Sequence, residues 1–289
     1  MKVRSAAAAI ALSTLAGCAS VAIDRAAVHR TALELVAAQN TAHPAESSGI
    51  GFPPRVFVGE YSSSAWEGSS SWNGWLSARR RYEVENGVFE TEDSILGVRR
   101  IQVMGSKASV VLTSSFAFKK DGRIVREPGI EAFTLSRFGD GWWVDGYAQL
   151  SEGKVAQGEE ARAVLDGARD YVHWLNTACV IPAKLVDSVL ITDDLQDWVR
   201  TGPGGDLQQP HKAPLLPGDP DSELVLGAPL RLSIGRSDAF VVFSAALESK
   251  DRKRIKGRGR LGLVLGRDGV LPGVAPSWGG GENIVWVPE

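Results

Sequence analysis

The feature that most constrains the fold of this chain is an internal duplication. Residues 24–42 align without gaps on residues 160–178, and several matched apolar positions have the three-and-four spacing of one helix face. Residues 104–124 also match residues 234–255 if one residue is inserted before Ala239, and each stretch reads as a strand, a charged turn and a return strand. The sequence therefore predicts two copies of one unit. The identical pairs in the helical stretches are Ala27/Ala163, Val28/Val164, Ala32/Ala168, Val36/Val172 and the triplets Asn40-Thr41-Ala42 and Asn176-Thr177-Ala178.

The two copies meet in the stretch SEGKVAQGEE, residues 151–160, which is polar and contains glycine. Its acidic end is typical of a helix start. The sequence predicts a first domain over residues 24–152, a linker over residues 153–159 and a second domain over residues 160–289. A chain of 289 residues is long enough for two modest hydrophobic cores.

The N-terminus has the pattern of an export signal. Lys2 and Arg4 precede an apolar run over residues 6–16 that is too short to span a bilayer as a mature helix. The run ends in Leu15-Ala16-Gly17-Cys18, which resembles the lipobox of bacterial lipoproteins. This resemblance implies that residues 1–17 are a signal peptide and that Cys18 is lipidated, with acyl chains such as palmitate. Residues 18–23 would be the lipidated tether.

Several acyl chains hold a protein stably on a membrane, whereas a single chain does not. By resemblance to lipoprotein sorting, Ala19 in place of an aspartate implies the outer membrane, with the protein facing the periplasm. The alternative is an ordinary secretory signal that is cut nearby and leaves Cys18 without a role.

Charge and motif spacing argue against several kinds of partner. The formal charge of −2 argues against nucleic acid, because binding to phosphates needs a basic excess. No spacing of His, Cys, Asp or Glu resembles a metal site. The stretch Gly257-Arg-Gly-Arg-Leu-Gly262 fits a dinucleotide-binding pattern but continues into another predicted strand, not into a helix. We therefore expect no metal and no cofactor.

The order of predicted elements resembles a known family. A first helix, short turns, a long hairpin and a last strand with the ending seen in residues 137–147 are similar to the nuclear transport factor 2-like (NTF2-like, or SnoaL-like) superfamily. The resemblance implies an α+β fold of two tandem cone-shaped domains, each an N-terminal helix packed on a curved antiparallel sheet. The second copy departs from the pattern: Gly269-Val270-Leu271-Pro272 replaces Gly141-Trp142-Trp143, and a long loop covers residues 201–220.

Candidate site residues in the first domain come from its last strand and from an aromatic stretch. Strict alternation along residues 143–147 would place Trp143, Asp145 and Tyr147 on one face. If that face lines the cone, Asp145 and Tyr147 are candidates for a catalytic base and a hydrogen-bond donor; if not, they are surface residues. Trp72, Trp75 and Trp143 are candidate ligand-binding aromatics, and the alternative for Trp72 and Trp75 is a core role.

A basic stretch in the second domain is a candidate anion-binding surface. Five cations at alternate positions would stack on one face of an extended strand. Such a ladder fits an anionic envelope component, or it protects a sheet edge from aggregation. The five residues are Arg252, Arg254, Lys256, Arg258 and Arg260.

The function expected from the sequence is a non-catalytic ligand-binding or protein-scaffolding role in the cell envelope. The protein would be held on the membrane through Cys18, with an envelope protein or an anionic envelope component as a partner. The alternative is a SnoaL-like isomerase, cyclase or hydrolase that acts on a small hydrophobic substrate in the first domain. The sequence leaves the oligomeric state open.

Overall fold

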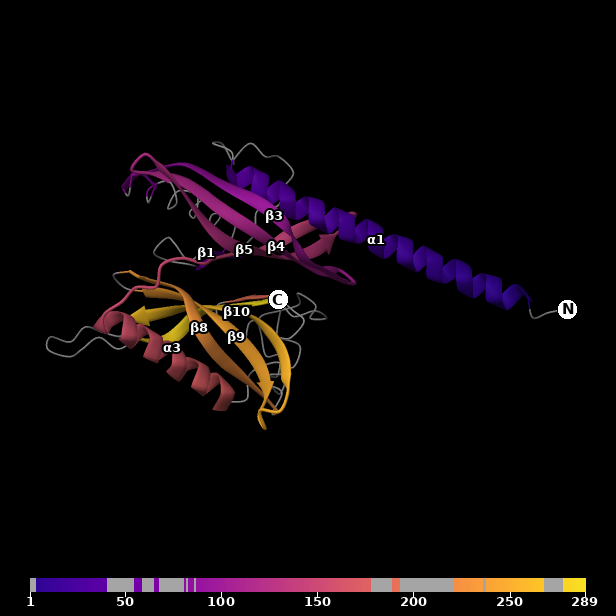
Figure 1. Cartoon of the computed structure of the whole chain (residues 1–289). Coiled ribbons are helices and arrows are strands. Elements are labelled where there is room, and N and C mark those ends of the chain that lie inside the picture. Colours follow the sequence, from indigo (N-terminus) through magenta and orange to yellow (C-terminus); the bar gives the residue numbers. More distant parts are fainter. Residues whose placement is uncertain are drawn as a thin grey trace.

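The structure, a computed structural model, describes residues 4–40, 55–58, 65–67, 81, 83–85, 87–177, 189–192, 221–235, 238–267 and 278–289. Within these residues the chain forms two long helices and two sheets (Figure 1). The predicted fold class is confirmed. Both halves are α+β, and each half packs one helix on a largely antiparallel sheet.

The first half begins with a helix and ends with a six-stranded sheet, which we call sheet A. Its strand order is β2-β1-β6-β5-β4-β3. Neighbouring strands from β3 to β6 are antiparallel, and β1 joins the edge of β6 in parallel. The elements are α1 (Arg4–Asn40), β1 (Arg55–Val58), β2 (Ala65–Glu67), β3 (Val88–Met104), β4 (Lys107–Lys120), β5 (Arg123–Phe138) and β6 (Gly141–Ser151).

The second half repeats this plan with a five-stranded sheet, sheet B, in the order β7-β11-β10-β9-β8. Met104 and Ile234, which the sequence alignment pairs, are the last residues of β3 and β8. Helix α3 begins directly after Gly158, whose positive φ of 107° suits a glycine. The elements are α3 (Glu159–Thr177), β7 (Leu190–Thr192), β8 (Ser222–Ile234), β9 (Asp238–Ser249), β10 (Ile255–Arg267) and β11 (Trp278–Pro288).

The duplication extends to individual hydrogen bonds. In the first half, Asn40 donates its side-chain amide to the Asp93 carbonyl at 2.7 Å and accepts the Asp93 backbone N–H at 2.8 Å. In the second half, Asn176 makes the same two bonds with the backbone of Leu224, at 2.9 and 2.8 Å. Each asparagine thus joins the end of its helix to the first strand of its long hairpin.

The two halves stack through their sheets, so the layers run α1, sheet A, sheet B, α3 (Figure 1). We call the face of each sheet that packs on its helix the inner face, and the face that packs on the other sheet the outer face. Each inner face has its own apolar core. The outer faces share a third core made by Val111, Ile130, Ala132, Ala148 and Leu150 of sheet A with Phe240, Val242, Val264, Val285 and Val287 of sheet B, together with Val189.

Helix α1 is longer than the helix expected from the repeat. It runs without a break from Arg4 through position 18 to Asn40, and its N-terminal part projects away from both sheets (Figure 1). The contacts with sheet A come from its second half, where Val28, Ala32 and Leu35 are fully buried. Asp24, near the start of that half, pairs with Arg137 at 3.2 Å. Among the described residues, no helix combines the length and the apolar character needed to cross a membrane.

Candidate functional site

The candidate site is a group of polar side chains buried between α1 and the inner face of sheet A. Alternation along the strands directs these side chains to the same face as the apolar core of the first half. All of them are at least nine-tenths buried. We call the group the inner polar cluster: Gln39 of α1, Asp93 of β3, Ser114 of β4, Glu131 of β5, and Tyr147 and Gln149 of β6.

Hydrogen bonds connect several members of the cluster. Gln149 donates its side-chain N–H to Asp93 Oδ1 at 2.7 Å, and the Tyr147 hydroxyl lies 3.4 Å from Glu131 Oε2. The Tyr147 ring also packs on Phe133, with ring centroids 5.2 Å apart. The backbone of Asp93 is held by the end of α1. The cluster therefore offers two carboxylates, two amides, a phenol and a serine hydroxyl between α1 and sheet A.

Gln39 is the least satisfied member of the cluster. It continues the buried face of α1 that Val28, Ala32 and Leu35 form, because it lies four residues after Leu35. The residue is only 5% exposed, yet neither polar atom of its side-chain amide has a hydrogen-bond partner among the described residues. A buried amide in this state is costly, by about 1–3 kcal/mol. A ligand that donates and accepts hydrogen bonds would remove that cost.

The matching positions in the second half are apolar. Strand register gives the correspondence, since Glu131 pairs with Leu112 and Gln149, whereas Leu261 pairs with Phe243 and Trp286. The six cluster positions, in the order given above, correspond to Leu175, Leu224, Ala245, Leu261, Ile284 and Trp286, and all six belong to the apolar core of the second half. One half thus has a polar interior at the positions where its copy has a packed hydrophobic core.

Trp286 shows how the second half is filled. Its indole is fully buried under α3 and lies over Gly259, where an added Cβ would come within 2.8 Å of the ring. The equivalent glycine of the first half, Gly129, faces Ser114, and a Cβ there would lie 3.4 Å from the Ser114 hydroxyl oxygen. The tryptophan and its glycine fill this part of the second inner face, and the indole Nε1 is buried there without a hydrogen-bond partner among the described residues.

The expectation that Asp145 shares a face with Tyr147 is wrong. Thr134 pairs with Gly146 and Leu135 pairs with Val144, so Asp145 is the extra residue of a β-bulge. The bulge reverses the alternation: Tyr147 faces inward, whereas Asp145 lies on the outer face of sheet A. The predicted catalytic pair is therefore not formed, because its two members lie on opposite faces of the sheet.

Asp145 belongs instead to an ion pair at the end of the outer face. It lies 3.4 Å from Lys107 Nζ and accepts a hydrogen bond from the Ser136 hydroxyl, while Lys107 also lies 2.6 Å from Ser136 Oγ. Trp143, the predicted aromatic of the same strand, is 43% exposed. It points away from the inner polar cluster, since its neighbours Trp142 and Val144 face the core. The other two predicted aromatics, Trp72 and Trp75, lie outside the described residues.

The predicted basic ladder is not one extended strand. Arg252 and Arg254 lie in the turn before β10, where Arg252 has a left-handed φ of 56°, and Lys256, Arg258 and Arg260 follow within β10. The register of β10 against β9 also shifts between Ile255 and Gly257. The five cations therefore do not stack on one strand face as regular alternation predicted.

Three of these cations have partners. Arg252 pairs with Glu223 at 3.2 Å, and Lys256 donates to the Ser222 hydroxyl at 2.6 Å. Arg260 pairs with Glu152, the residue directly after β6. Burial lowers the pKa of the Arg260 guanidinium, and the charge of Glu152 opposes that shift. The exposed side chains of Arg254 and Arg258 have no ion-pair partner within the described part of the chain.

Two further properties of the chain bear on its chemistry. In the described part of the chain, no group of three or more His, Cys, Asp or Glu side chains is placed to hold a metal ion.

In the turn before β10, hydrogen bonds from the Ser249 hydroxyl and the Lys253 backbone hold the pKa of Asp251 below its usual value.

Sequence reasoning missed Asp93, Glu131 and Gln149. One signal was present: Glu131 is the single charged residue in the largely apolar run Gly129-Ile-Glu-Ala-Phe-Thr-Leu135. A lone charge inside a predicted buried strand marks a polar site in the core. The repeat gave a second signal, because the second copy has only apolar residues at the matching strand positions.

Comparison with known proteins gives matches among solved structures only. No protein-family model and no curated protein matches the chain. An NTF2-like protein with a cystatin-like fold from Novosphingobium aromaticivorans is 14% identical, with a TM-score of 0.38, over 53% of this chain and 95% of that one. An NTF2-like superfamily protein from Salmonella enterica is 15% identical, with a TM-score of 0.36, over 48% and 98%. A ketosteroid isomerase-like protein from Erwinia carotovora atroseptica is 17% identical, with a TM-score of 0.35, over 45% and 96%.

Proposed function

We propose that this protein is an envelope lipoprotein that binds a small polar ligand, without converting it, between α1 and sheet A of its first half. The observation that carries the proposal is the inner polar cluster, whose six positions are all apolar in the second half. In this proposal the first half binds the ligand, and the second half, whose interior is apolar, stabilises the first half by packing on sheet A.

The energetic argument is that the cluster costs stability in the absence of a ligand. Buried polar groups are tolerated when they are hydrogen-bonded, and a well-packed apolar residue of similar size is often as stable or more stable. Sheet B, the copy of sheet A in the second half, has Leu261 and Trp286 at the positions that correspond to Glu131 and Gln149. A polar interior that an apolar one could replace is typical of a site where binding, not stability, determines the residues.

The receptor proposal is tested with substitutions chosen from the residues that the second half has at the matching positions. The double variant Glu131→Leu, Tyr147→Phe removes the carboxylate and the phenolic hydroxyl together and places leucine where the second half has leucine. We expect this variant to fold with unchanged or raised stability, because both partners of a buried hydrogen bond are removed. The soluble Cys18→Ser chain would be screened by thermal shift against a library of small hydroxylated and amide-bearing compounds.

Ligands that stabilise the parent chain should have no effect on the double variant. The matched control is Leu261→Val in the second half, which should keep the ligand response at a lower melting temperature. A screen in which every stabilising compound keeps its full effect on the double variant would contradict the proposal.

A catalytic alternative rests on one contact in the same cluster. The Tyr147 hydroxyl, 3.4 Å from Glu131 Oε2, forms a phenol–carboxylate pair that can exchange a proton with a bound carbonyl compound. This pair replaces Asp145 and Tyr147 in the enzyme interpretation. Each ligand from the thermal screen would be incubated with the protein and analysed by mass spectrometry and NMR. Turnover that Tyr147→Phe abolishes while binding persists would favour the enzyme over the receptor.

The lipid anchor is the second part of the proposal. Cys18 lies six residues before Asp24, whose carboxylate pairs with Arg137 and so fixes α1 against sheet A at that point. An acylated Cys18 would thus hold the first half close to the bilayer, and Ala19 favours the outer membrane. We expect Cys18→Ser to move the protein from the membrane fraction to the soluble fraction. The variant Ser20→Ala is the control, and retention of the Cys18→Ser protein on the membrane would refute the anchor.

A contact with an anionic envelope component is proposed for the turn before β10 and the first residues of that strand. Arg254 and Arg258 carry it, since their side chains are exposed and have no ion-pair partner in the described part of the chain. Charge reversal at both positions should abolish a salt-sensitive association with envelope extracts. Charge reversal at the exposed Lys120 of sheet A is the control. An association that the Arg254 and Arg258 variants leave unchanged would favour the edge-protection alternative.

A further inference from the structure

A pocket at the junction of the two halves lies apart from the inner polar cluster. Its volume is about 740 Å³, within the range of small-molecule sites, and such sites often occur between domains. The linker contributes Lys154, Val155, Ala156 and Gln157, strand β8 contributes residues 231–234, and β5 of the first half contributes Glu127.

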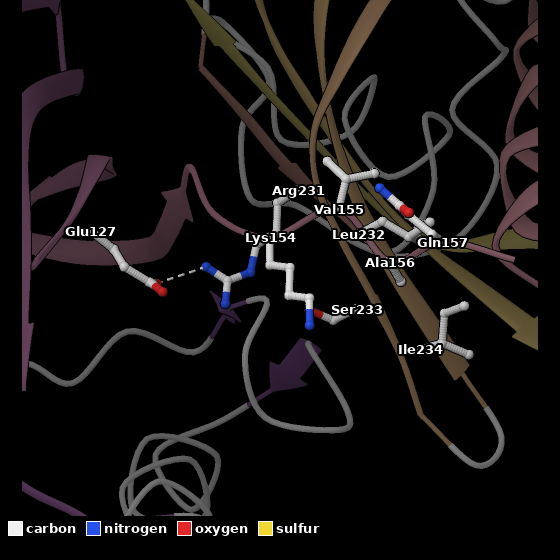
Figure 2. A pocket seen from close by; sticks show the side chains of 9 residues that line it. All are labelled: Glu127, Lys154, Val155, Ala156, Gln157, Arg231, Leu232, Ser233 and Ile234. Atoms are coloured by element: carbon white, nitrogen blue, oxygen red, sulfur yellow. Dashed lines mark hydrogen bonds and ion pairs between the residues drawn. The ribbon is translucent and has the colours of Figure 1, made fainter. Parts of the chain in front are cut away.

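The polar end of this pocket is held in place by contacts across the junction. Arg231 is only 9% exposed, pairs with Glu127 at 3.1 Å and donates to the Ser151 hydroxyl at 2.5 Å. The linker backbone packs closely on the guanidinium, since a Cβ added at Gly153 would lie 2.9 Å from Arg231 Nη1. Figure 2 shows the guanidinium directed toward Glu127, with Lys154 beside it. The cation is therefore fixed in position before any ligand arrives.

Lys154 gives this end of the pocket an excess of positive charge. Glu127 already pairs with Arg231, whereas the Lys154 amine has no ion-pair partner among the described residues. An ammonium group beside a neutralised arginine–glutamate pair favours an anion.

The opposite end of the pocket is apolar. Val155, Ala156, Leu232 and Ile234 line it, and Figure 2 shows Ile234 at a distance from Glu127 and the Arg231 guanidinium. Backbone hydrogen bonds hold the linker on β8 here: Leu232 donates to the Lys154 carbonyl and Ala156 donates to the Leu232 carbonyl, both at 3.2 Å. The apolar wall is thus as fixed as the polar end.

We propose that this junction pocket binds a small amphiphilic anion, with its carboxylate, sulfonate or phosphate group at Lys154 and Arg231 and its apolar body against Val155 and Ile234. The site is independent of the proposed receptor site in the first half. Because residues of both halves line the pocket, a ligand bound there stabilises the junction and raises the melting temperature of the whole chain, by an amount that grows with the logarithm of the ligand concentration above its Kd.

The test is a fluorescence titration of the soluble Cys18→Ser chain with 1-anilinonaphthalene-8-sulfonate, which carries an anionic group on an apolar body. We expect one saturable site. Lys154→Glu should weaken binding by about tenfold, because it replaces an attraction with a repulsion at an exposed side chain that lines the pocket. Lys120→Glu, an equal charge change at an exposed lysine of sheet A, is the matched control and should have no effect.

A second variant tests the pocket without changing its charge. Ser233→Phe places a ring in the space and should abolish the saturable phase, while circular dichroism confirms that the chain is folded. Competition then tests the ligand class. Decanoate should displace the probe, whereas decanol, which has no charge, and inorganic phosphate, which has no apolar body, should not.

The possible outcomes separate this site from the receptor site. The double variant Glu131→Leu, Tyr147→Phe should bind the probe as the parent chain does, so failure of either proposal leaves the other standing. Equal effects of Lys154→Glu and Lys120→Glu would overturn the junction site, as would the absence of saturable binding to the parent chain. Displacement by decanol or by phosphate as effective as that by decanoate would overturn the proposed ligand class.

Discussion

At the scale of single residues, Asn40 and Asn176 are the clearest structural determinants, because each satisfies a strand N–H and a strand carbonyl from the end of a helix. Asn176→Ala removes both bonds to Leu224 and leaves two part-buried backbone groups without partners. We expect a loss of about 2 kcal/mol in the free energy of unfolding. Urea unfolding of the soluble chain measures this loss.

A graded control is available at the same position. Asn176→Asp keeps an oxygen that accepts the Leu224 N–H but loses the donor to the Leu224 carbonyl, so we expect a smaller loss than for alanine. A loss below about 0.5 kcal/mol for Asn176→Ala, the range of ordinary surface substitutions, would show that the bridge does not hold the helix to the strand.

The residue scale also shows where sequence reasoning failed. Counting alternate positions along β6 placed Asp145 and Tyr147 on one face, whereas the structure places them on opposite faces. The reason is one extra residue at Asp145; Gly146 beside it is the kind of strand-interior residue that often marks a bulge, but the count of alternate positions took no account of it. A single bulge moves every later side chain of a strand to the other face. Alternation therefore predicts a site only up to the first bulge.

At the scale of elements, the repeat predicted the hairpins correctly because their turns are visible in the sequence. Asp121 and Gly122 both have positive φ in the turn between β4 and β5, as Asp-Gly commonly does. The packing of the two outer faces on each other was not predicted, since pattern alone does not say which partner covers an apolar sheet face. The N-terminal extent of α1 was also missed, because its residues were assigned to the signal peptide and tether.

Strand β10 gives a prediction at this scale. At Gly259 an added Cβ would lie 2.5 Å from the Val287 carbonyl oxygen and 2.8 Å from the Trp286 ring, whereas at the equivalent Gly129 the nearest atoms lie at 3.4 Å. We expect Gly259→Ala to destabilise the chain by about 3 kcal/mol, the upper range for overpacking a core. Gly129→Ala should cost less than about 1 kcal/mol. Thermal unfolding of both variants checks this, and equal losses would contradict the assignment of Trp286 as the residue that fills the second interior.

At the scale of the whole molecule, the two halves serve each other as partners. Ion pairs cross the junction at its rim, from Arg231 to Glu127 and from Arg260 to Glu152. The apolar outer faces between them form one core. A chain whose two sheets already cover each other has no need of a second copy for that purpose, so we expect the soluble Cys18→Ser protein to be a monomer.

Separating the halves tests this arrangement. A fragment of residues 24–152 would expose the outer-face residues Val111, Ile130 and Leu150, which are buried in the intact chain. We expect this fragment to self-associate, and to form a one-to-one complex when residues 160–289 are added, because contiguous apolar surface is rarely left in water. Light scattering of each fragment and of their mixture measures both effects. Val242→Asp in the second fragment should prevent the complex, since it places a carboxylate in the shared core. If residues 24–152 remain monomeric and do not bind the second fragment, the sheet-to-sheet contact is too weak to join the halves, and the junction pocket would lose the fixed geometry on which its binding depends.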